Sequence, residues 1–305
     1  MRNIFGFAIL LVFVLHLFFV ESSAQKTGPD TIRFATYTYA TNNRIDNLRP
    51  LTDYLSKTTG RTVIAVSYPT VQRLIAAIVN DSVDFAMMNT SGYLVLQRKN
   101  PGIILPLVNL EISKNAITNY GGCLVASTTS GITTIGQLNK ENRKLSLALV
   151  SSSSTSGNLV PRLLLNKEGL RNAEEKFNVY YAGTHRQALQ EVLTGKANLA
   201  GCGCAEIDSA RARNEFDGKA IVVAEYNNTP LGPVVYNKKL NKDIVTDIRD
   251  ELIRVHQYRK AVFENFCAGW TEFKMASRFK LVRDADYDTF RKMFTDNKDL
   301  WRMIE

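Results

Sequence analysis

The 305-residue chain is poor in the residues that build reactive or metal-binding sites, with four cysteines and three histidines. No second Cys/His pair stands at zinc spacing, which speaks against a zinc site. A GxxxxGK[ST] loop is absent, which excludes a Walker-type nucleotide site, and a GxSxG turn is absent, which gives an activated serine nucleophile little support. We find no carboxylate pair, metal cluster or nucleophile–base spacing. The sequence therefore indicates no enzyme, no resident metal and no cofactor.

The chain also lacks a dense Lys/Arg stripe interleaved with aromatic residues and any RNP-like pattern, so we expect no nucleic-acid partner. Its formal net charge is +9. A basic balance raises the encounter rate with anions in general and does not select one class of anion. No fixed-period repeat and no low-complexity segment is visible.

Residues 1–24 have the layout of a cleaved secretory signal. Residues 4–20 are almost wholly apolar, and Ser22 and Ala24 are small residues at the −3 and −1 positions of a cut after Ala24. We therefore expect a periplasmic or otherwise exported protein. The alternative is a retained membrane anchor, because a run of about 17 apolar residues is near the lower limit for a span.

An exported chain can oxidise its cysteines. These are Cys123, Cys202, Cys204 and Cys267. A bridge between Cys202 and Cys204 would be strained, because the two are separated by one residue. The alternative is that they are small buried residues in strands. The sequence leaves the pairing open.

Strand-like runs alternate with amphipathic helical runs along the chain, which favours sheets with helices on their faces. In the first part, strands are expected at 31–39, 62–68, 83–89 and 102–111, with helices at 45–60, 70–82 and 91–100. A second α/β unit follows, with strands expected at 144–150, 176–183, 197–203 and 220–226. A helix is expected at 242–258, and the chain beyond it is expected to be helical.

This order predicts an α/β fold with two lobes, each a mainly parallel sheet flanked by helices, and a ligand cleft between them. Lobe I comprises 31–118 and 230–305, so it is discontinuous. Lobe II comprises 119–229. The chain crosses between the lobes near 112–126 and again near 226–236.

Six consecutive hydroxyl residues, 151–156, follow the strand at 144–150. Pro161 is tolerated only in the first turn of a helix, so we expect the next helix to begin near Gly157 or Asn158. The serine run then lies at the carboxyl end of a strand and just before a helix N-terminus. Ligands of α/β sheets bind at such ends, and a helix N-terminus attracts anions.

The residues expected to form an uncharged oxyanion cradle are Ser154, Thr155, Ser156 and Gly157. The three hydroxyls would donate hydrogen bonds, and the glycine would let a ligand oxygen approach the backbone. The alternative is a serine-rich loop that only caps the helix.

The stretch SSTSGNLVPRLLL resembles the phosphate/phosphite/phosphonate substrate-binding proteins of ABC transporters (PhnD-type). VDFAMMNTSGYL, YYAGTHRQALQEVLTGKANLAG and TPLGPVVYNKKLNKDIVTDIRDEL resemble later segments of that family in the same order. The likeness covers nearly all of 31–290. It implies a type II periplasmic binding protein, a monomer that closes on a small anionic ligand and delivers it to an ABC permease and ATPase.

The resemblance carries over to individual residues only where they match. It implies that Ser154, Thr155 and Ser156 form the oxyanion-binding triplet and that His185 helps to hold the anion. Glu206 lies within one residue of a family position that touches a ligand hydroxyl or amine. From the residues alone, a lone histidine at a helix start such as His185 is more often a capping or surface residue. Glu206 fits a solvated helix start equally well.

The chain departs from the phosphonate-binder pattern at three positions. Val71 stands where those proteins have a cleft tyrosine, and Tyr68, three residues earlier, is a candidate replacement. Met88, followed by Asn89, stands where they have an aromatic residue. Gly232 replaces an aspartate that would pair with an ammonium group, which argues against an aminoalkylphosphonate ligand.

The leading hypothesis is an extracytoplasmic binding protein that captures a small oxyanion, such as phosphate, phosphite or a phosphonate, for an ABC importer. One alternative is a binding protein of the same fold that reports its ligand to a separate membrane receptor. Another is an exported enzyme with a Ser- or Cys-based site near 202–204.

Overall fold

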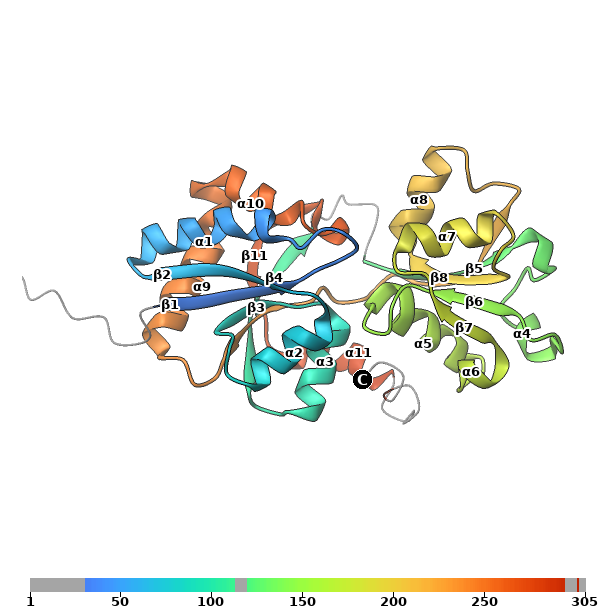
Figure 1. Ribbon diagram of the computed structural model, residues 1–305, viewed down its shortest axis with the longest axis horizontal. Helices are drawn as coiled ribbons and strands as arrows, with labels where there is room; N and C mark the ends of the chain where they lie inside the picture. Colours follow the sequence, from blue (N-terminus) through green and yellow to red (C-terminus); the bar gives the residue numbers. More distant parts are fainter. Residues whose placement is uncertain (1–30, 113–119, 294–300, 302–305) are drawn as a thin grey trace, which may run out of the picture.

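The computed structural model describes residues 31–112, 120–293 and 301. The expected signal peptide and the cut after Ala24 lie outside the described residues and remain predictions. The described chain forms two α/β lobes, each built around one sheet (Figure 1). This confirms the predicted fold class. None of the described helices is long and apolar enough to cross a membrane.

The sheet of lobe I contains six strands. In spatial order they are β11 (Ala276–Leu281), β4 (Ile104–Ile112), β10 (Val234–Asn237), β3 (Phe85–Met87), β1 (Thr31–Tyr37) and β2 (Thr62–Tyr68). The strand β1 pairs in parallel with β2 and β3, whereas β10 and β11 run antiparallel to their neighbours. Both neighbours of β4 therefore come from the second half of the chain.

The sheet of lobe II contains five strands. In spatial order they are β7 (Asn178–Tyr181), β6 (Ser146–Leu149), β8 (Leu199–Gly203), β5 (Gly122–Ser127) and β9 (Ala220–Tyr226). The strand β6 pairs in parallel with β7 and β8, and β5 runs antiparallel to β8 and β9. The segment 122–226 thus completes a sheet of its own.

Both sheets are mixed, although the sequence predicted mainly parallel ones. The strands that run against the others in their sheets are β5, which follows the first crossing, β10, which lies at the second, and the edge strand β11. The end of the chain is not wholly helical either, since β11 adds an edge strand whose alternation buries Phe279 against β4.

Helices cover both faces of each sheet (Figure 1). In lobe I these are α1 (Ile45–Thr59), α2 (Val71–Val79), α3 (Thr90–Lys99), α9 (Lys242–Tyr258), α10 (Lys260–Cys267) and α11 (Asp288–Lys292). In lobe II they are α4 (Gln137–Lys140), α5 (Val160–Lys167), α6 (Ala173–Lys176), α7 (His185–Leu193) and α8 (Cys204–Ala212). Short helical turns lie at η1 (Thr128–Ser130), η2 (Thr155–Leu159), η3 (Thr271–Phe273) and η4 (Asp284–Tyr287).

Local sequence explains where several helices begin and end. Gly60 ends α1 with φ 64°, a left-handed conformation that glycine adopts without steric cost, and its N–H donates to Ser56 O at 3.0 Å. Thr70 begins α2 by accepting a hydrogen bond from Arg73 N–H at 3.1 Å. The observed α9 coincides with the helix expected at 242–258.

The apolar core is divided into three clusters of buried side chains. One lies within lobe I between its sheet and the helices α1, α9 and α10, and another lies within lobe II under α7 and α8. The third is shared, because it joins Tyr93 and Leu94 of α3 to Leu159 and Val160 of lobe II. The lobes are therefore in apolar contact along one side of the molecule.

A disulfide joins Cys123, on β5, to Cys204, the first residue of α8. The two are 81 residues apart in the sequence, and their Cα atoms are 5.2 Å apart. Cys202 and Cys267 are free and buried. The bond resolves the pairing that the sequence left open, and it fastens the start of α8 to the central part of the lobe II sheet.

We predict that replacing Cys123 and Cys204 together with serine lowers the free energy of unfolding by about 2–4 kcal/mol, because the bond restricts a long loop in the unfolded chain. Urea unfolding of the oxidised protein and the double variant measures this. Adding a thiol reductant should destabilise the parent and leave the double variant unaffected. Equal sensitivity of both proteins to reductant would contradict the assignment.

Candidate functional site

A cavity of about 950 Å³ is lined by both lobes. Lobe I contributes the loops after β1 and β2 and the segment around η3. Lobe II contributes the whole serine run, the start of α7 and the start of α8. Six of the residues singled out from the sequence as ligand-binding line this cavity, namely Asn89, Ser154, Thr155, Ser156, His185 and Glu206. The structure thus brings together most of the expected site.

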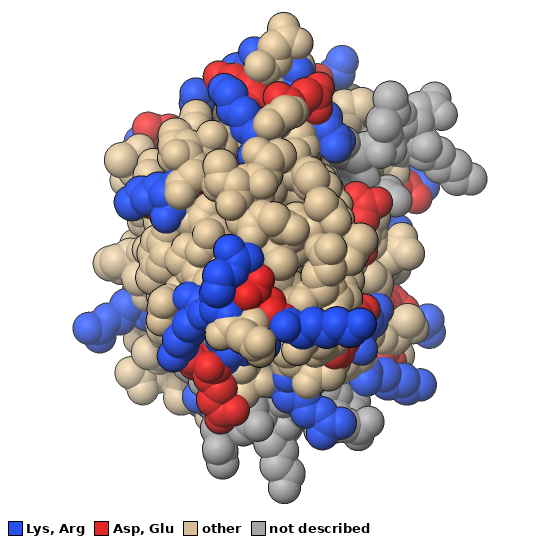
Figure 2. Space-filling model, turned by 90° about the vertical axis from the view of Figure 1, so that its right-hand side faces the viewer, with Lys and Arg blue, Asp and Glu red and all other residues tan. Residues whose placement is uncertain are grey.

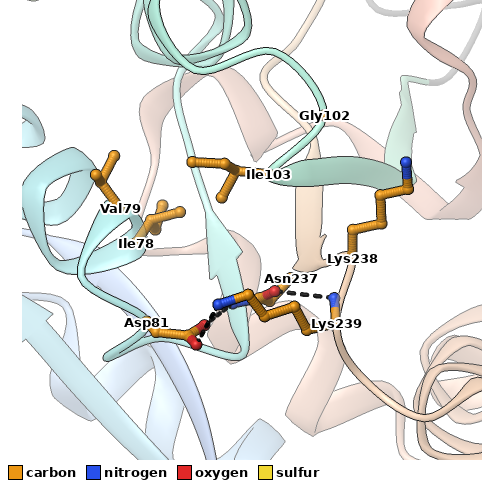
Figure 3. A pocket seen from close by; sticks show the side chains of 8 residues that line it. All are labelled: Ile78, Val79, Asp81, Gly102, Ile103, Asn237, Lys238 and Lys239. Atoms are coloured by element: carbon orange, nitrogen blue, oxygen red, sulfur yellow. Dashed lines mark hydrogen bonds and ion pairs between the residues drawn. The ribbon is translucent and has the colours of Figure 1, made fainter.

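A smaller cavity of about 240 Å³ lies on lobe I near Ile78 and Ile103 (Figure 3). Its carboxylate, Asp81, already accepts hydrogen bonds from Lys239 Nζ at 2.6 Å and from Asn237 Nδ2 at 2.5 Å. Because these polar groups satisfy one another, this hollow is a weaker candidate for an anion site than the cleft.

The serine run ends in an unusual helix start. The wide turn η2 begins at Thr155, with Ser154 as its N-cap, whereas the sequence predicted a start near Gly157 or Asn158. Its hydrogen bonds span five residues: Leu159 N–H donates to Ser154 O at 3.0 Å, and Val160 N–H donates to Thr155 O. Thr155 and Ser156 therefore belong to the first turn, where N–H groups lack partners within the helix.

Pro161 explains the wide turn. A proline has no N–H to donate to the carbonyl four residues earlier, which here belongs to Gly157. That carbonyl instead accepts a hydrogen bond from Val150 N–H at 3.0 Å. The helix start is thereby tied to the end of β6, and the hydroxyls of the serine run are held beside the cleft.

Gly157 does not play the part expected from the sequence. It does not line the cavity, and a Cβ built on it would lie 2.2 Å from Val150 Cγ2 and 3.0 Å from His185 Cε1. Its N–H donates to Ser154 Oγ at 3.1 Å. The glycine is therefore required by close packing against β6, and not by the approach of a ligand oxygen.

The serine run touches lobe I directly. Asn89 Nδ2 donates to Ser153 O at 2.8 Å, while Asn89 Oδ1 accepts from Gly92 N–H and caps α3. Ser91 N–H donates to Thr155 Oγ1 at 3.0 Å. Both lobe I donors belong to the loop and first turn that follow β3. Asn89 is thus a cleft residue, as expected, and it contacts the cradle from the opposite lobe.

Two further hydrogen bonds join the lobes. Gln72 Nε2 donates to Ser152 Oγ at 3.2 Å, and His185 N–H donates to Tyr39 Oη at 3.0 Å. The second of these places a lobe I hydroxyl at the N-terminus of α7. Four hydrogen bonds thus join the described lobes around the serine run.

His185 stands at the first position of α7, after the N-cap Thr184. Its Nδ1 accepts a hydrogen bond from Gly203 N–H at 2.9 Å, so in the neutral ring the proton is on Nε2. Burial lowers the pKa of His185 to about 4. The residue is therefore neutral at pH 7, and it offers one N–H donor without a charge.

Of the other two expected residues, one lines the cleft and one does not. Glu206 lines the cleft from the first turn of α8, with Arg213 Nη2 at 3.6 Å from Oε1. Tyr68 is not among the residues that line the cavity, because this last residue of β2 packs against the core cluster shared by the lobes. The aromatic wall is made instead by Tyr37, Tyr39 and Tyr120.

No motif in the sequence marks these tyrosines as cleft residues. Tyr37 and Tyr39 belong to the segment predicted as a strand, and Tyr120 belongs to a predicted crossing between the lobes. Burial raises the pKa of the Tyr120 hydroxyl, while hydrogen bonding to Thr155 and Ser156 acts in the opposite direction. Tyr120 therefore lies beside the cradle.

Arg44 was also missed. It is 4% exposed, and its backbone has φ 60°. Its Nε donates to Gly269 O at 2.9 Å and its Nη1 to Tyr37 O at 3.1 Å. The guanidinium carbon lies 4.6 Å from the ring centroids of both Tyr37 and Trp270. This buried cation lines the cleft, and no spacing motif in the sequence predicted it.

The three departures noted in the sequence have structural counterparts. A Cβ on Gly232 would lie 1.9 Å from Met88 O, so the backbone there is too close for any side chain. Met88 is wholly buried and does not line the cavity. Val71 lines the cavity from the start of α2.

A family model described as "ABC transporter, phosphonate, periplasmic substrate-binding protein" matches residues 34–281. The chain belongs to this family. Its members are binding proteins, so the chain is a binding protein and not an enzyme. A Ser- or Cys-based active site near 202–204 is accordingly set aside, and the buried thiol of Cys202 has its pKa raised by burial to about 12.

Solved structures share the fold of this phosphonate-binding family member. A Xanthomonas citri protein bound to ATP aligns with a TM-score of 0.73 and 17% identity, over 91% of this chain and 100% of that one. PhnD1 from Prochlorococcus marinus with methylphosphonate gives 0.68 and 12%, over 88% and 98%. A phosphonate-transporter binding protein from Pseudomonas aeruginosa gives 0.67 and 18%, over 88% and 86%.

We predict that Gly157→Ala lowers the free energy of unfolding by about 1–3 kcal/mol, because the new methyl group overlaps Val150. Alanine favours helices over glycine, so only this overlap can make the change unfavourable. Thermal or urea unfolding measures it. Gly157→Ala should lower the free energy of unfolding less in a Val150→Ala background than in the parent, because the overlapping side chain has been shortened. Equal costs in the two backgrounds, that is strict additivity, would count against the packing role.

We predict that His185 makes stability depend on pH between about 6.5 and about 4. The unfolded chain protonates this histidine near its ordinary pKa, but the folded chain does so only near pH 4. The free energy of unfolding therefore falls as pH falls through this window, by at most about 1.4 kcal/mol per pH unit from this residue.

Comparison with His185→Asn isolates the effect, because asparagine can accept the Gly203 bond and does not titrate. The difference in unfolding free energy between parent and variant should shift in favour of the variant as the pH falls from 6.5 to 4. A difference that stays constant over this range would show that His185 is not held neutral.

Proposed function

We propose that this protein is exported and captures a ligand bearing a phosphorus oxyanion in the cleft, then delivers it to an ABC permease and its ATPase. The anion would be held by Ser154, Thr155, Ser156 and the Nε2–H of His185. Ser154 already accepts from Gly157 N–H but keeps its own hydrogen as a donor. Asn89 and Glu206 line the same cleft.

One observation carries this proposal: the hydroxyl of Thr155 lies at the contact between the lobes. Its oxygen accepts from Ser91 N–H of lobe I at 3.0 Å, and that bond does not use the hydroxyl hydrogen, which could turn to an anion in the cleft. A ligand bound by this hydroxyl would favour the closed arrangement, since the contact and the ligand use the same group. Differential contact in the closed state is what allows a ligand to shift such an equilibrium.

The proposed donors are neutral, which suits a small desolvated anion. The first turn of η2 directs N–H groups and a partial positive charge towards the cleft side. Hydrogen bonds to an ionised acceptor are roughly twice as strong as those between neutral groups. Affinity therefore needs no ion pair at the cradle, and the neutral state of His185 at pH 7 is consistent with this chemistry.

The relatives support a phosphorus oxyanion. Methylphosphonate, bound by the Prochlorococcus marinus protein, and ATP, bound by the Xanthomonas citri protein, share tetrahedral phosphorus with ionised oxygens. We infer that this shared group, a phosphorus oxyanion, binds in the cradle of this chain. The parts of the ligand beyond phosphorus are then selected by the remaining cleft wall.

Closure would move lobe I (31–118 and 230–305) against lobe II (119–229), with the protein acting as a monomer. The face of the molecule seen in Figure 2 carries Lys and Arg side chains interspersed with Asp and Glu around a broad uncharged area. As the alternative, a separate membrane receptor would bind the closed, liganded protein. Stimulation of a reconstituted permease–ATPase by the liganded protein would distinguish delivery from sensing.

We predict that Thr155→Ala weakens binding of methylphosphonate or phosphate about ten- to a hundredfold, because one hydrogen bond to a charged group is lost. Isothermal titration of ligand-free protein measures the dissociation constants. Thermal unfolding checks that the variant is folded, and a bound ligand should raise the midpoint by mass action.

Thr155→Ser is the matched control, since it keeps the hydroxyl and the bond from Ser91. It should bind within a few-fold of the parent. If the alanine variant bound as tightly as the parent, or if no phosphorus oxyanion bound to the parent, the serine run would only cap the helix.

A further inference from the structure

The cleft is much larger than the cradle. A cavity of about 950 Å³ lies at the upper end of the range of about 300–1,000 Å³ that holds drug-sized ligands. A bare phosphorus oxyanion with four or five heavy atoms would fill a small part of it. The rest of the wall therefore has to be matched by an organic portion of the ligand.

Arg44 supplies a fixed positive charge to this wall. Its hydrogen bonds to Gly269 O and Tyr37 O use Nε and Nη1, and its side chain is buried against aromatic rings. A guanidinium has five N–H donors, so these two bonds leave others that could reach a group in the cavity that Arg44 lines. Because the side chain is held from several sides, it cannot swing towards a carboxylate elsewhere in the cleft.

Glu272 supplies a negative charge to the same wall. It belongs to η3, is half-buried and lines the cavity, and among the described residues it forms no ion pair. Burial raises its pKa, while a hydrogen bond from the backbone N–H and the charge of Arg44 act in the opposite direction. Burial also raises the pKa values of Tyr39 and Tyr120, to which the charge of Glu272 adds. Glu272 thus lines the same cavity as Tyr39 and Tyr120.

Arg44 and Glu272 are therefore opposite charges in one cavity that do not pair with each other. An uncompensated charge in a partly desolvated site is costly unless a partner reaches it. An ammonium group would satisfy Glu272, and a carboxylate would satisfy Arg44 with bidentate geometry. A single ligand end that carries both groups is an amino-acid moiety.

We infer that the ligand is an organophosphorus amino acid, with its phosphonate or phosphate group in the Ser154–Ser156 cradle, its carboxylate on Arg44 and its ammonium on Glu272. This inference rests on the proposed function, because it takes the cradle as the phosphorus site. The absence of an aspartate at Gly232 counted against an amine-bearing ligand in the sequence. Glu272 supplies such a carboxylate from a different segment.

Isothermal titration against five ligands tests this inference on the mature, ligand-free protein. The ligands are methylphosphonate, aminoethylphosphonate, phosphonopropionate, aminophosphonobutyrate and phosphoserine. They carry neither group, the ammonium alone, the carboxylate alone, or both groups on a phosphonate or on a phosphate ester. We expect whichever of aminophosphonobutyrate and phosphoserine binds more tightly to bind at least about tenfold more strongly than each of the other three ligands, as one charge-assisted hydrogen bond implies. The comparison of those two identifies the phosphorus group.

The variant Glu272→Gln should abolish the advantage of the amine-bearing ligands, so that the ratio of Kd values between phosphonopropionate and aminophosphonobutyrate approaches one. Glu264→Gln is the matched control, because Glu264 is an exposed carboxylate of lobe I that pairs with Lys260 and does not line the cleft. It should retain the parental ratio.

The outcomes separate the two proposals. If methylphosphonate bound as tightly as the amino acids, or if Glu272→Gln kept the full preference, the amino-acid inference would be wrong while the cradle stood. If no phosphorus ligand bound to the parent, the cradle and the inference would both fall.

Discussion

The site depends on one missing hydrogen, the N–H that Pro161 does not have. Without it, the carbonyl of Gly157 has no partner in the helix, and Val150 N–H at the end of β6 takes it. This bond widens the first turn and presses the helix start against the strand, where only a glycine fits. Thr155 and Ser156 are held at the cleft as a result. A regular helix beginning two residues later would have left both hydroxyls in a loop.

The same hydroxyls join the lobes. Ser91 N–H reaches Thr155, and Asn89 reaches the carbonyl of Ser153, so the contact between lobes is made of the groups that surround the proposed anion. The neutral ring of His185 adds a donor whose geometry is set by Gly203. Binding and closure thus draw on one set of hydrogen bonds. In the proposed complex, selectivity would come from a different part of the wall, which Arg44 lines.

Sequence patterns predicted the two-lobed α/β fold and the place of the cradle because both are local. Strand and helix periodicity shows in short windows, and the run 151–156 stands beside the helix that it caps. What was missed depends on contacts between distant segments. Arg44 lines the cleft because Gly269, 225 residues away, accepts its hydrogen bond, and no local spacing records that. The antiparallel pairing of β10 and β11 with β4 likewise joins segments more than a hundred residues apart.

The position of β4 has a consequence for the order in which the chain can acquire its structure. Its neighbours in the sheet, β10 and β11, begin at Val234 and Ala276, more than a hundred residues after β4 ends. The five strands of lobe II all lie within that interval. During synthesis or translocation the middle of the polypeptide can therefore assemble its sheet first. The amino-terminal lobe must meanwhile keep β4 unpaired until the carboxyl-terminal strands emerge to flank it.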